Sequence, residues 1–300
     1  MAEIDRIPMI DVWVNMFTPE VCHRVYVETP ELKGVVDWWG LDSAKGFEVP
    51  DFVQRLDDAN VSKIVIPSMK MWAHQRRALC YSVEVEEIVA AAEQAPGRIY
   101  GAAGINPWEG MKGVRKLEQA ITEYGFVAGH IHAYGFDTPL NHRDWYPFYA
   151  KCAELGVPVI VQVGHSAEFM PIAVGQPVLI DDVALYFPEL TIICSHTGWP
   201  WVEEMMALAW KHPNVHIATT THAPKYWDPK FVKFANSRGQ DKVMFASGWP
   251  TMDHIRARAE IEALGLKETV LPKLLHDNAA KALPRLEAEP VGDVVATAGR

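Results

Sequence analysis

Short runs of apolar residues alternate with amphipathic stretches along most of the chain. Each run is continuously apolar, which is typical of strands buried on both faces of a parallel sheet. A strand is predicted in each of eight such runs, at residues 7–14, 61–67, 99–105, 126–132, 157–163, 190–194, 215–219 and 242–247. A stretch with helical character follows each run, so the pattern predicts successive β/α units.

Helices are predicted between these strands, with ends marked by proline, glycine and charged residues. They are expected from Val49 onward and at residues 75–94, 110–124, 145–155, 181–187, 200–212, 229–237, 253–264 and 268–283. Pro200 is expected at the first helical position, where its missing N–H costs nothing. Eight β/α units in 300 residues fit an α/β fold of the (β/α)8 TIM-barrel type better than an open sheet.

Two segments depart from this repeating pattern. Residues 1–284 are predicted to form a single barrel domain with an insertion at about residues 16–50, which carries Trp38 and Trp39. Long loops in compact domains are often lids or partner surfaces, and an exposed tryptophan pair can equally be a dimer contact. Residues 285–300 are small and polar and are predicted to form a C-terminal tail.

Composition narrows the classes of partner. The formal charge of −10 argues against nucleic acids and anionic membranes, which require basic patches. The four cysteines are scattered without a CxxC pair, so neither a disulfide framework nor a thiolate zinc site is indicated. The first residues, MAEIDRIPMIDV, do not resemble a signal peptide, and no apolar run is long enough to cross a bilayer. We therefore expect a soluble, cytoplasmic protein.

Residues that directly follow the strands of a TIM barrel face one cavity. The residues in these positions are Trp13, Asn15, His132, Tyr134, His165, His196, His222, Ser247, Gly248 and Trp249. Four histidines at equivalent places are hard to ascribe to packing, so we expect at least two of them to be functional. Glu168 and Asp253 lie just beyond the rim and can serve as bases, although solvated helix ends are the more usual role for such carboxylates.

Several longer motifs together resemble one known family. They are GHIHAYGFD with WYPFYAKCAELGVPVIVQVGHS, then ICSHTGWPWVEEMMALAWKHPNVHIATTTHAPKYW, and DKVMFASGWP with the late LLHDNAAKAL. These motifs are similar to the amidohydrolase-related (amidohydrolase 2) enzymes of the aminocarboxymuconate semialdehyde decarboxylase type, and the resemblance covers most of the chain. It implies a TIM barrel that catalyses hydrolysis or non-oxidative decarboxylation.

The resemblance also identifies missing metal ligands. The family typically carries His-x-His after the first strand and an aspartate after the eighth, where this chain has Trp13, Asn15 and Gly248. His165 matches the remaining ligand histidine, and His196 matches the family's catalytic acid/base histidine. A catalytic zinc needs about three nitrogen or oxygen ligands, so we expect no metal cofactor.

Histidine acid–base chemistry is the option that remains without a metal. Catalytic roles are predicted for His196, His165 and His222. An alternative is a relocated zinc site bound by these same three side chains. Substrate-binding roles are predicted for Trp13, Asn15, His132, Tyr134, Ser247 and Trp249.

Our main prediction is a metal-independent hydrolase for a small cyclic or unsaturated substrate, with or without a carboxylate or an aromatic ring. The superfamily's pyrone-dicarboxylate lactonases are a precedent for hydrolysis without metal. One alternative is a non-oxidative decarboxylase, lyase or hydratase on the same scaffold. Another is a catalytically silent barrel that binds a ligand. The resemblance also allows a homodimer.

Overall fold

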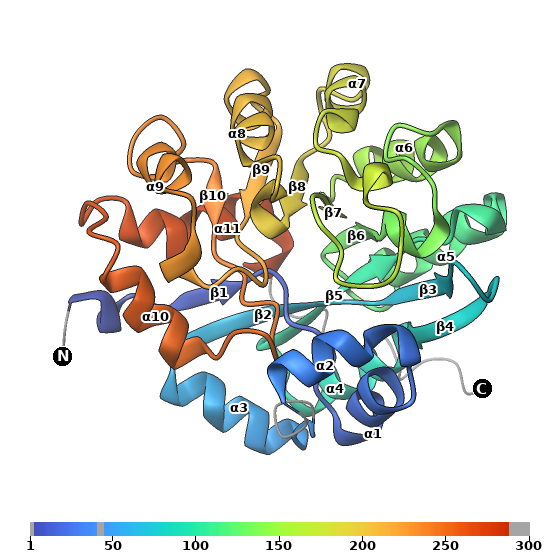
Figure 1. Cartoon of the computed structure of the whole chain (residues 1–300), viewed down its shortest axis with the longest axis horizontal. Coiled ribbons are helices and arrows are strands. Elements are labelled where there is room, and N and C mark those ends of the chain that lie inside the picture. The colour runs from blue at the N-terminus through green and yellow to red at the C-terminus, as the bar shows by residue number, and fades with distance from the viewer. Residues whose placement is uncertain (1–2, 41–44, 288–300) are drawn as a thin grey trace, which may run out of the picture.

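A computed structural model describes residues 3–40 and 45–287 of the chain. Its main sheet contains eight parallel strands in the order β1-β2-β5-β6-β7-β8-β9-β10. These are β1 (Met9–Asp11), β2 (Val61–Pro67), β5 (Ile99–Gly104), β6 (Ala128–Ile131), β7 (Val159–Gln162), β8 (Ile192–Ser195), β9 (Val215–Ala218) and β10 (Val243–Met244). Each strand overlaps one of the eight predicted runs, and the predicted TIM barrel is confirmed (Figure 1).

The barrel closes between β10 and β1 through the residues that follow the two strands. Val14 and Trp249 form a parallel bridge, and Gly248 N donates a hydrogen bond to Trp13 O at 2.9 Å. The buried carboxylate of Asp11 reinforces this junction, because it accepts hydrogen bonds from Ser247 N at 3.0 Å and His254 Nε2 at 2.8 Å. The junction therefore fixes the first and last rim segments relative to each other.

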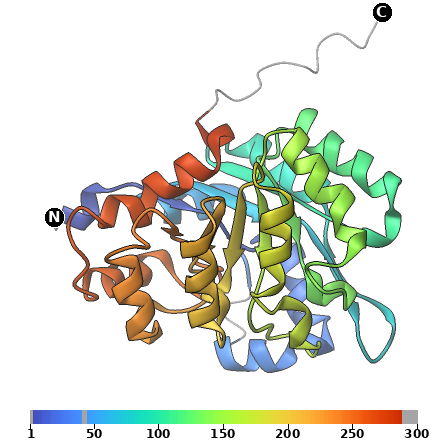
Figure 2. The same ribbon diagram turned by 90° about the horizontal axis from the view of Figure 1, so that it is seen from above.

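Helices cover the outside of the barrel. The main ones are α3 (Val49–Asp58), α4 (Val85–Gln94), α5 (Met111–Thr122), α6 (Tyr146–Glu154), α7 (Leu179–Tyr186), α8 (Val202–Lys211), α9 (Pro229–Ala235), α10 (His254–Glu262) and α11 (Asn278–Ala282). In α5 the buried residues Val114, Leu117 and Ile121 recur at helical spacing, which gives one apolar face toward the strands. Figure 2 shows α6 to α9 side by side around the barrel.

The predicted helix at residues 75–94 is wrong in its first half. Strands β3 (Met69–Ala73) and β4 (Ala78–Val83) form an antiparallel hairpin there, and α4 begins only at Val85. Buried residues Tyr81 and Val83 alternate with less buried neighbours along β4, which is the period of a strand. The Glu84 side chain then caps α4 in a capping box with Glu87.

Two predicted helix boundaries also differ from the structure. Helix α8 begins at Val202, and Pro200 belongs to the preceding turn. The predicted helix at residues 268–283 is interrupted by a π-helical turn at Lys273–Asp277. Within this turn, the carbonyl of Leu274 accepts a hydrogen bond from Phe245 N at 2.8 Å. That contact connects the turn to the end of β10.

The insertion lies over the carboxyl ends of the strands. It contains α1 (Pro19–Cys22), a π-helical turn at His23–Val27, and α2 (Lys33–Trp39). Two ion pairs of 2.7 Å fasten it to the hairpin and α4, Arg24 with Glu87 and Glu31 with Arg76. The hydrogen bond from Arg76 lowers the pKa of Glu31 to about 2, so this contact persists through mildly acidic pH.

Near the C-terminus, the first residues of the predicted tail pack on the barrel instead of lying outside it. Arg285 donates hydrogen bonds to the carbonyls of Ile121 and Leu155, and Leu286 is buried. Residues 288–300 of the predicted tail lie outside the described residues. In the described part of the chain, all four cysteines are free thiols. No helix there has the length and apolar character needed to cross a membrane.

Candidate active site

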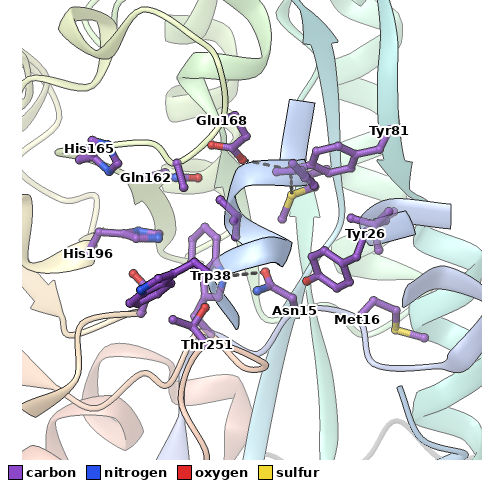
Figure 3. Close-up of a pocket in the computed structure, with 18 of the residues that line it drawn as sticks. Asn15, Met16, Tyr26, Trp38, Tyr81, Gln162, His165, Glu168, His196 and Thr251 are labelled. Atoms are coloured by element: carbon purple, nitrogen blue, oxygen red, sulfur yellow. Dashed lines mark hydrogen bonds between the residues drawn. The ribbon is translucent and has the colours of Figure 1, made fainter. Parts of the chain in front are cut away.

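A cavity of about 320 Å³ lies at the carboxyl ends of the strands, beneath the insertion (Figure 3). It is lined by Trp13, Asn15, Met16, Val25, Tyr26, Leu32, Val35, Trp38, Met69, Tyr81, Val83, Gln162, His165, Ala167, Glu168, His196, Thr221, His222 and Thr251. This end of a TIM barrel is where active sites form. The three histidines predicted to be catalytic all reach the cavity.

His196 projects from an unusual backbone segment after β8. His196 and Thr197 both have left-handed φ angles, +63° and +54°, a conformation that costs energy in residues other than glycine. The hydroxyl of Thr197 donates to the carbonyl of His196 at 2.7 Å, which holds the turn. Strained backbone of this kind concentrates at functional sites.

Ser195 forms a hydrogen bond with the ring of His196. Ser195 Oγ lies 2.8 Å from His196 Nδ1 and donates its only proton to Val161 O at 3.3 Å. In the tautomer that matches this arrangement, Ser195 Oγ accepts from the His196 Nδ1–H and Nε2 keeps a free lone pair. Burial, with the nearby His222 next in importance, keeps the pKa of His196 well below its usual value, so the ring is neutral at physiological pH.

His165 and His222 lie near each other around Trp199. The Trp199 ring centre is 5.3 Å from that of His165 and 6.0 Å from that of His222. His165 is exposed at the cavity mouth, and its backbone N–H donates to Trp199 O at 2.6 Å. Burial, followed by the charge of His165, lowers the pKa of His222 to about 4. His222 therefore enters the site as a neutral hydrogen-bonding group.

Trp13 and Asn15 also line the cavity, as predicted for substrate-binding residues. The indole of Trp13 packs edge-on against His196, with ring centres 5.4 Å apart. Its Nε1 donates to Asn15 Oδ1 at 3.1 Å, and Asn15 Nδ2 donates to Trp249 O at 2.8 Å. The Asn15 amide thus links the rim segments that follow β1 and β10.

Three other residues predicted to bind substrate do not line the cavity. The fully buried Tyr134 donates its hydroxyl hydrogen to Gly164 O at 2.5 Å. Ser247 Oγ accepts a hydrogen bond from Trp249 N at 3.0 Å, and the Trp249 ring packs edge-on against Phe52 at 5.1 Å. These contacts commit all three side chains to the packing around the rim.

Glu168 was expected by default to be a solvated helix end, and the structure corrects this. Its side chain is only 11% exposed, reaches the cavity, and accepts a hydrogen bond from Tyr81 at 3.2 Å. Burial by itself raises the pKa of Glu168, but the nearby His132 and Tyr81 outweigh burial and lower it. Asp253, in contrast, caps α10 and pairs with Arg55 at the surface, as expected for a helix end.

His132 lies behind the cavity wall instead of lining it. It is 2% exposed, and its Nε2 is 3.5 Å from Glu168 Oε1, so it touches the cavity through that carboxylate. The neighbouring His130 packs edge-on against Trp13 with ring centres 4.8 Å apart, and burial lowers its pKa to about 3. The His-x-His spacing of these residues, which places both rings on one face of β6, was the available sequence signal for His130.

The residues at the family's metal positions do not fit a metal. Trp13 offers no ligand atom, and the Asn15 oxygen faces the indole N–H. Gly248 has φ +61°, and a Cβ there would lie 2.4 Å from Thr221 Cγ2, so a carboxylate has no room. Among residues 3–40 and 45–287, no three or more His, Cys, Asp or Glu side chains are arranged to hold an ion. The alternative zinc site of His165, His196 and His222 therefore lacks the required geometry.

Comparisons with known proteins agree with this architecture. A family profile described as Amidohydrolase matches residues 71–285. A 2-keto-4-carboxy-3-hexenedioate hydratase from Sphingobium sp. is 24% identical over 211 residues, which is 59% of this chain and 62% of that protein. The chain thus spans less than two thirds of that curated relative's length.

Solved structures show the same fold. An uncharacterised TIM-barrel protein from Bordetella bronchiseptica superposes with a TM-score of 0.77 at 22% identity, covering 94% of this chain and 100% of that one. A manganese-bound 5-carboxyvanillate decarboxylase from Novosphingobium aromaticivorans gives 0.70 at 14% identity, covering 95% and 99%. A 2,6-dihydroxybenzoate decarboxylase from Rhizobium gives 0.67 at 15% identity, covering 93% and 99%. With the profile matching more than half of its residues, the chain belongs to the amidohydrolase family (Amidohydro_2).

Proposed function

We propose that this protein is a hydratase-type lyase that adds water to a carbon–carbon double bond conjugated to a carbonyl group, or removes it. The similar proteins with named activities are a hydratase and decarboxylases, and this favours the lyase alternative over the hydrolase that the sequence suggested. The observation that carries the proposal is the buried His196 in the cavity lining, whose Nδ1 lies 2.8 Å from Ser195 Oγ and whose pKa burial lowers.

This arrangement provides a general base that needs no metal. In the hydration direction, His196 Nε2 takes a proton from water as the water oxygen bonds to the β-carbon. The π electrons of the double bond move toward the carbonyl, giving an enolate. The protonated His196 then returns a proton to the α-carbon, so that one water has been added in total. Dehydration is the same sequence in reverse.

Other cavity residues can stabilise the charge that develops on the carbonyl oxygen. Gln162 lies at the end of β7 and lines the cavity beside His165 (Figure 3). Its side-chain amide can donate an N–H to the substrate oxygen. His222 provides a ring N–H from the segment after β9. Prearranged donors of this kind commonly contribute 10²–10³-fold in rate.

The proposal is tested by incubating the purified protein with a panel of cyclic enones and their β-hydroxy ketones in ¹⁸O-labelled water. We expect loss of enone absorbance and one ¹⁸O atom per product molecule. The variant His196→Gln should lose at least 100-fold in rate, while His142→Gln, at a half-exposed surface histidine, should not change it. Ester hydrolysis without enone turnover, or equal rates in both variants, would contradict the proposal.

A further inference from the structure

The charge of the cavity lining is unusual for a protein related to enzymes of acidic substrates. Neither lysine nor arginine is found among the described residues that line it. Glu168 is the lining residue with a carboxylate, and the polar remainder consists of histidines, tyrosines, threonines and amides. The cavity therefore offers a substrate carboxylate no permanent positive charge to pair with.

Two of the three histidines that line the cavity, His196 and His222, do not readily replace that missing cation. Burial opposes protonation of His196 and His222, whose pKa values are both lowered. His132 does not line the cavity, and its Nε2 faces Glu168 Oε1 at 3.5 Å. An ionised carboxylate placed in this cavity would lose its water, gain no Lys or Arg partner among the described lining residues, and be repelled by Glu168.

Glu168 is instead positioned to accept a hydrogen bond from a ligand. The contacts of Tyr81 and His132 are both made to Oε1. Figure 3 shows the carboxylate between Gln162 and Tyr81, on the cavity wall. A hydrogen-bond donor on the ligand can use the second oxygen, and charge-assisted hydrogen bonds of this kind are strong.

The rest of the lining suits an apolar body. Val25, Leu32 and Val35 come from the insertion, and Met69 and Val83 come from the β3–β4 hairpin. With the aromatic rings they enclose about 320 Å³, which is at the lower end of the usual range for small-molecule sites. One small ring with short substituents matches this space.

We propose that the cavity takes an uncharged ring compound that donates an O–H or N–H hydrogen bond to Glu168 and carries no carboxylate. This inference rests on the proposed function in placing the substrate in this cavity. It separates the protein from the related decarboxylases, two of which were solved with substituted benzoic acids.

Calorimetric titration with three matched probes tests the inference. They are 4-ethylphenol, its methyl ether 4-ethylanisole, and 4-ethylbenzoate. The phenol should bind at least tenfold more tightly than the ether, and the benzoate should show no saturable binding. Tighter binding of the benzoate than of the phenol would overturn the proposal, as would absence of phenol binding at millimolar concentration.

Three variants sharpen this test. Glu168→Gln should remove the preference for the phenol over the ether, whereas Asp253→Asn, at a carboxylate outside the cavity, should keep it. Ala167→Lys places a cation at an exposed position of the lining and should allow the benzoate to bind, even if Glu168→Gln does not fold. An unchanged preference in Glu168→Gln, or no benzoate binding in Ala167→Lys, would refute the role of charge. Binding is measured without turnover, so an inactive enone assay would defeat only the proposed reaction.

Discussion

Trp13 donates its indole N–H to the side-chain oxygen of Asn15 at 3.1 Å, and these are the two positions where the family places its paired histidine ligands. The Asn15 amide nitrogen continues the connection to Trp249 O on the last rim segment. A corner of the barrel that would bind an ion in related enzymes is therefore held by hydrogen bonds between side chains and backbone.

A first prediction concerns metal content. Because the side chains at these positions supply no set of ligands, protein purified without added metal should contain well under one equivalent of zinc, manganese or iron. Elemental analysis measures this directly, and treatment with a chelator should leave turnover unchanged. The prediction fails if the protein contains a full equivalent of metal. It also fails if a chelator inactivates the protein and added metal restores the activity.

A second prediction concerns Gly248, which occupies the position of the family's aspartate. Gly248→Ala should cost about 1–2 kcal/mol from the positive φ, with a further penalty of about 1–3 kcal/mol from overpacking against Thr221. Gly97→Ala is the matched control, because Gly97 has φ +77° but open space around it, so only the first cost applies. Urea unfolding of the two variants separates the contributions. Equal losses of stability in the two variants would mean that Thr221 does not restrict the side chain at position 248.

A third prediction follows from the neutral state of His196. The base is active when unprotonated, and burial lowers its pKa, so activity should persist as the pH falls through 6.5 and should decline only well below that value. NMR titration of ¹³C-labelled histidine follows the ring without needing a substrate. His196 should keep the chemical shift of neutral imidazole as the pH falls through 6.5. A titration midpoint of His196 near pH 6.5 would show that its pKa is not lowered.

Ser195 is expected to act as a positioning residue rather than to touch the substrate. In Ser195→Ala, His196 Nδ1 loses its acceptor, so the fixed tautomer should become a mixture. The ¹⁵N shifts of the two ring nitrogens report this mixture directly. We expect kcat to fall about fivefold with KM little changed, because about 1 kcal/mol of hydrogen bonding is lost. Unaltered ¹⁵N shifts would assign Ser195 a purely structural role.

Sequence patterns located the part of the site that is built on strands. Buried apolar runs place the strand ends, so His165, His196, His222 and the Trp13 segment could be assigned to one rim from spacing alone. The other half of the cavity could not be found in this way. Tyr26 and Tyr81 come from the insertion and the hairpin, whose positions over the barrel depend on tertiary contacts such as the Glu31–Arg76 ion pair.

Glu168 shows the same limit for a single residue. The residues around it, HSAEFMPIAVG, show neither helix nor strand periodicity, and nothing local indicates Tyr81 or His132 as partners. Its burial results from the hairpin that was predicted as a helix. An error in one secondary-structure element therefore hid the carboxylate on which the substrate class depends.

The hairpin provides a final prediction, which tests its turn. Arg77 is exposed and has φ +51° in this turn, and left-handed backbone costs a residue with a Cβ about 1–2 kcal/mol. Glycine avoids that cost but has more freedom in the unfolded chain, so Arg77→Gly should stabilise the protein by about 0.5–1 kcal/mol. Gln75→Gly, at an exposed residue of the same turn without a positive φ, should destabilise it by about 0.5 kcal/mol. Thermal unfolding of both variants measures the difference. If residues 75–94 were instead one helix, both substitutions would lower the stability, by about 1 kcal/mol each.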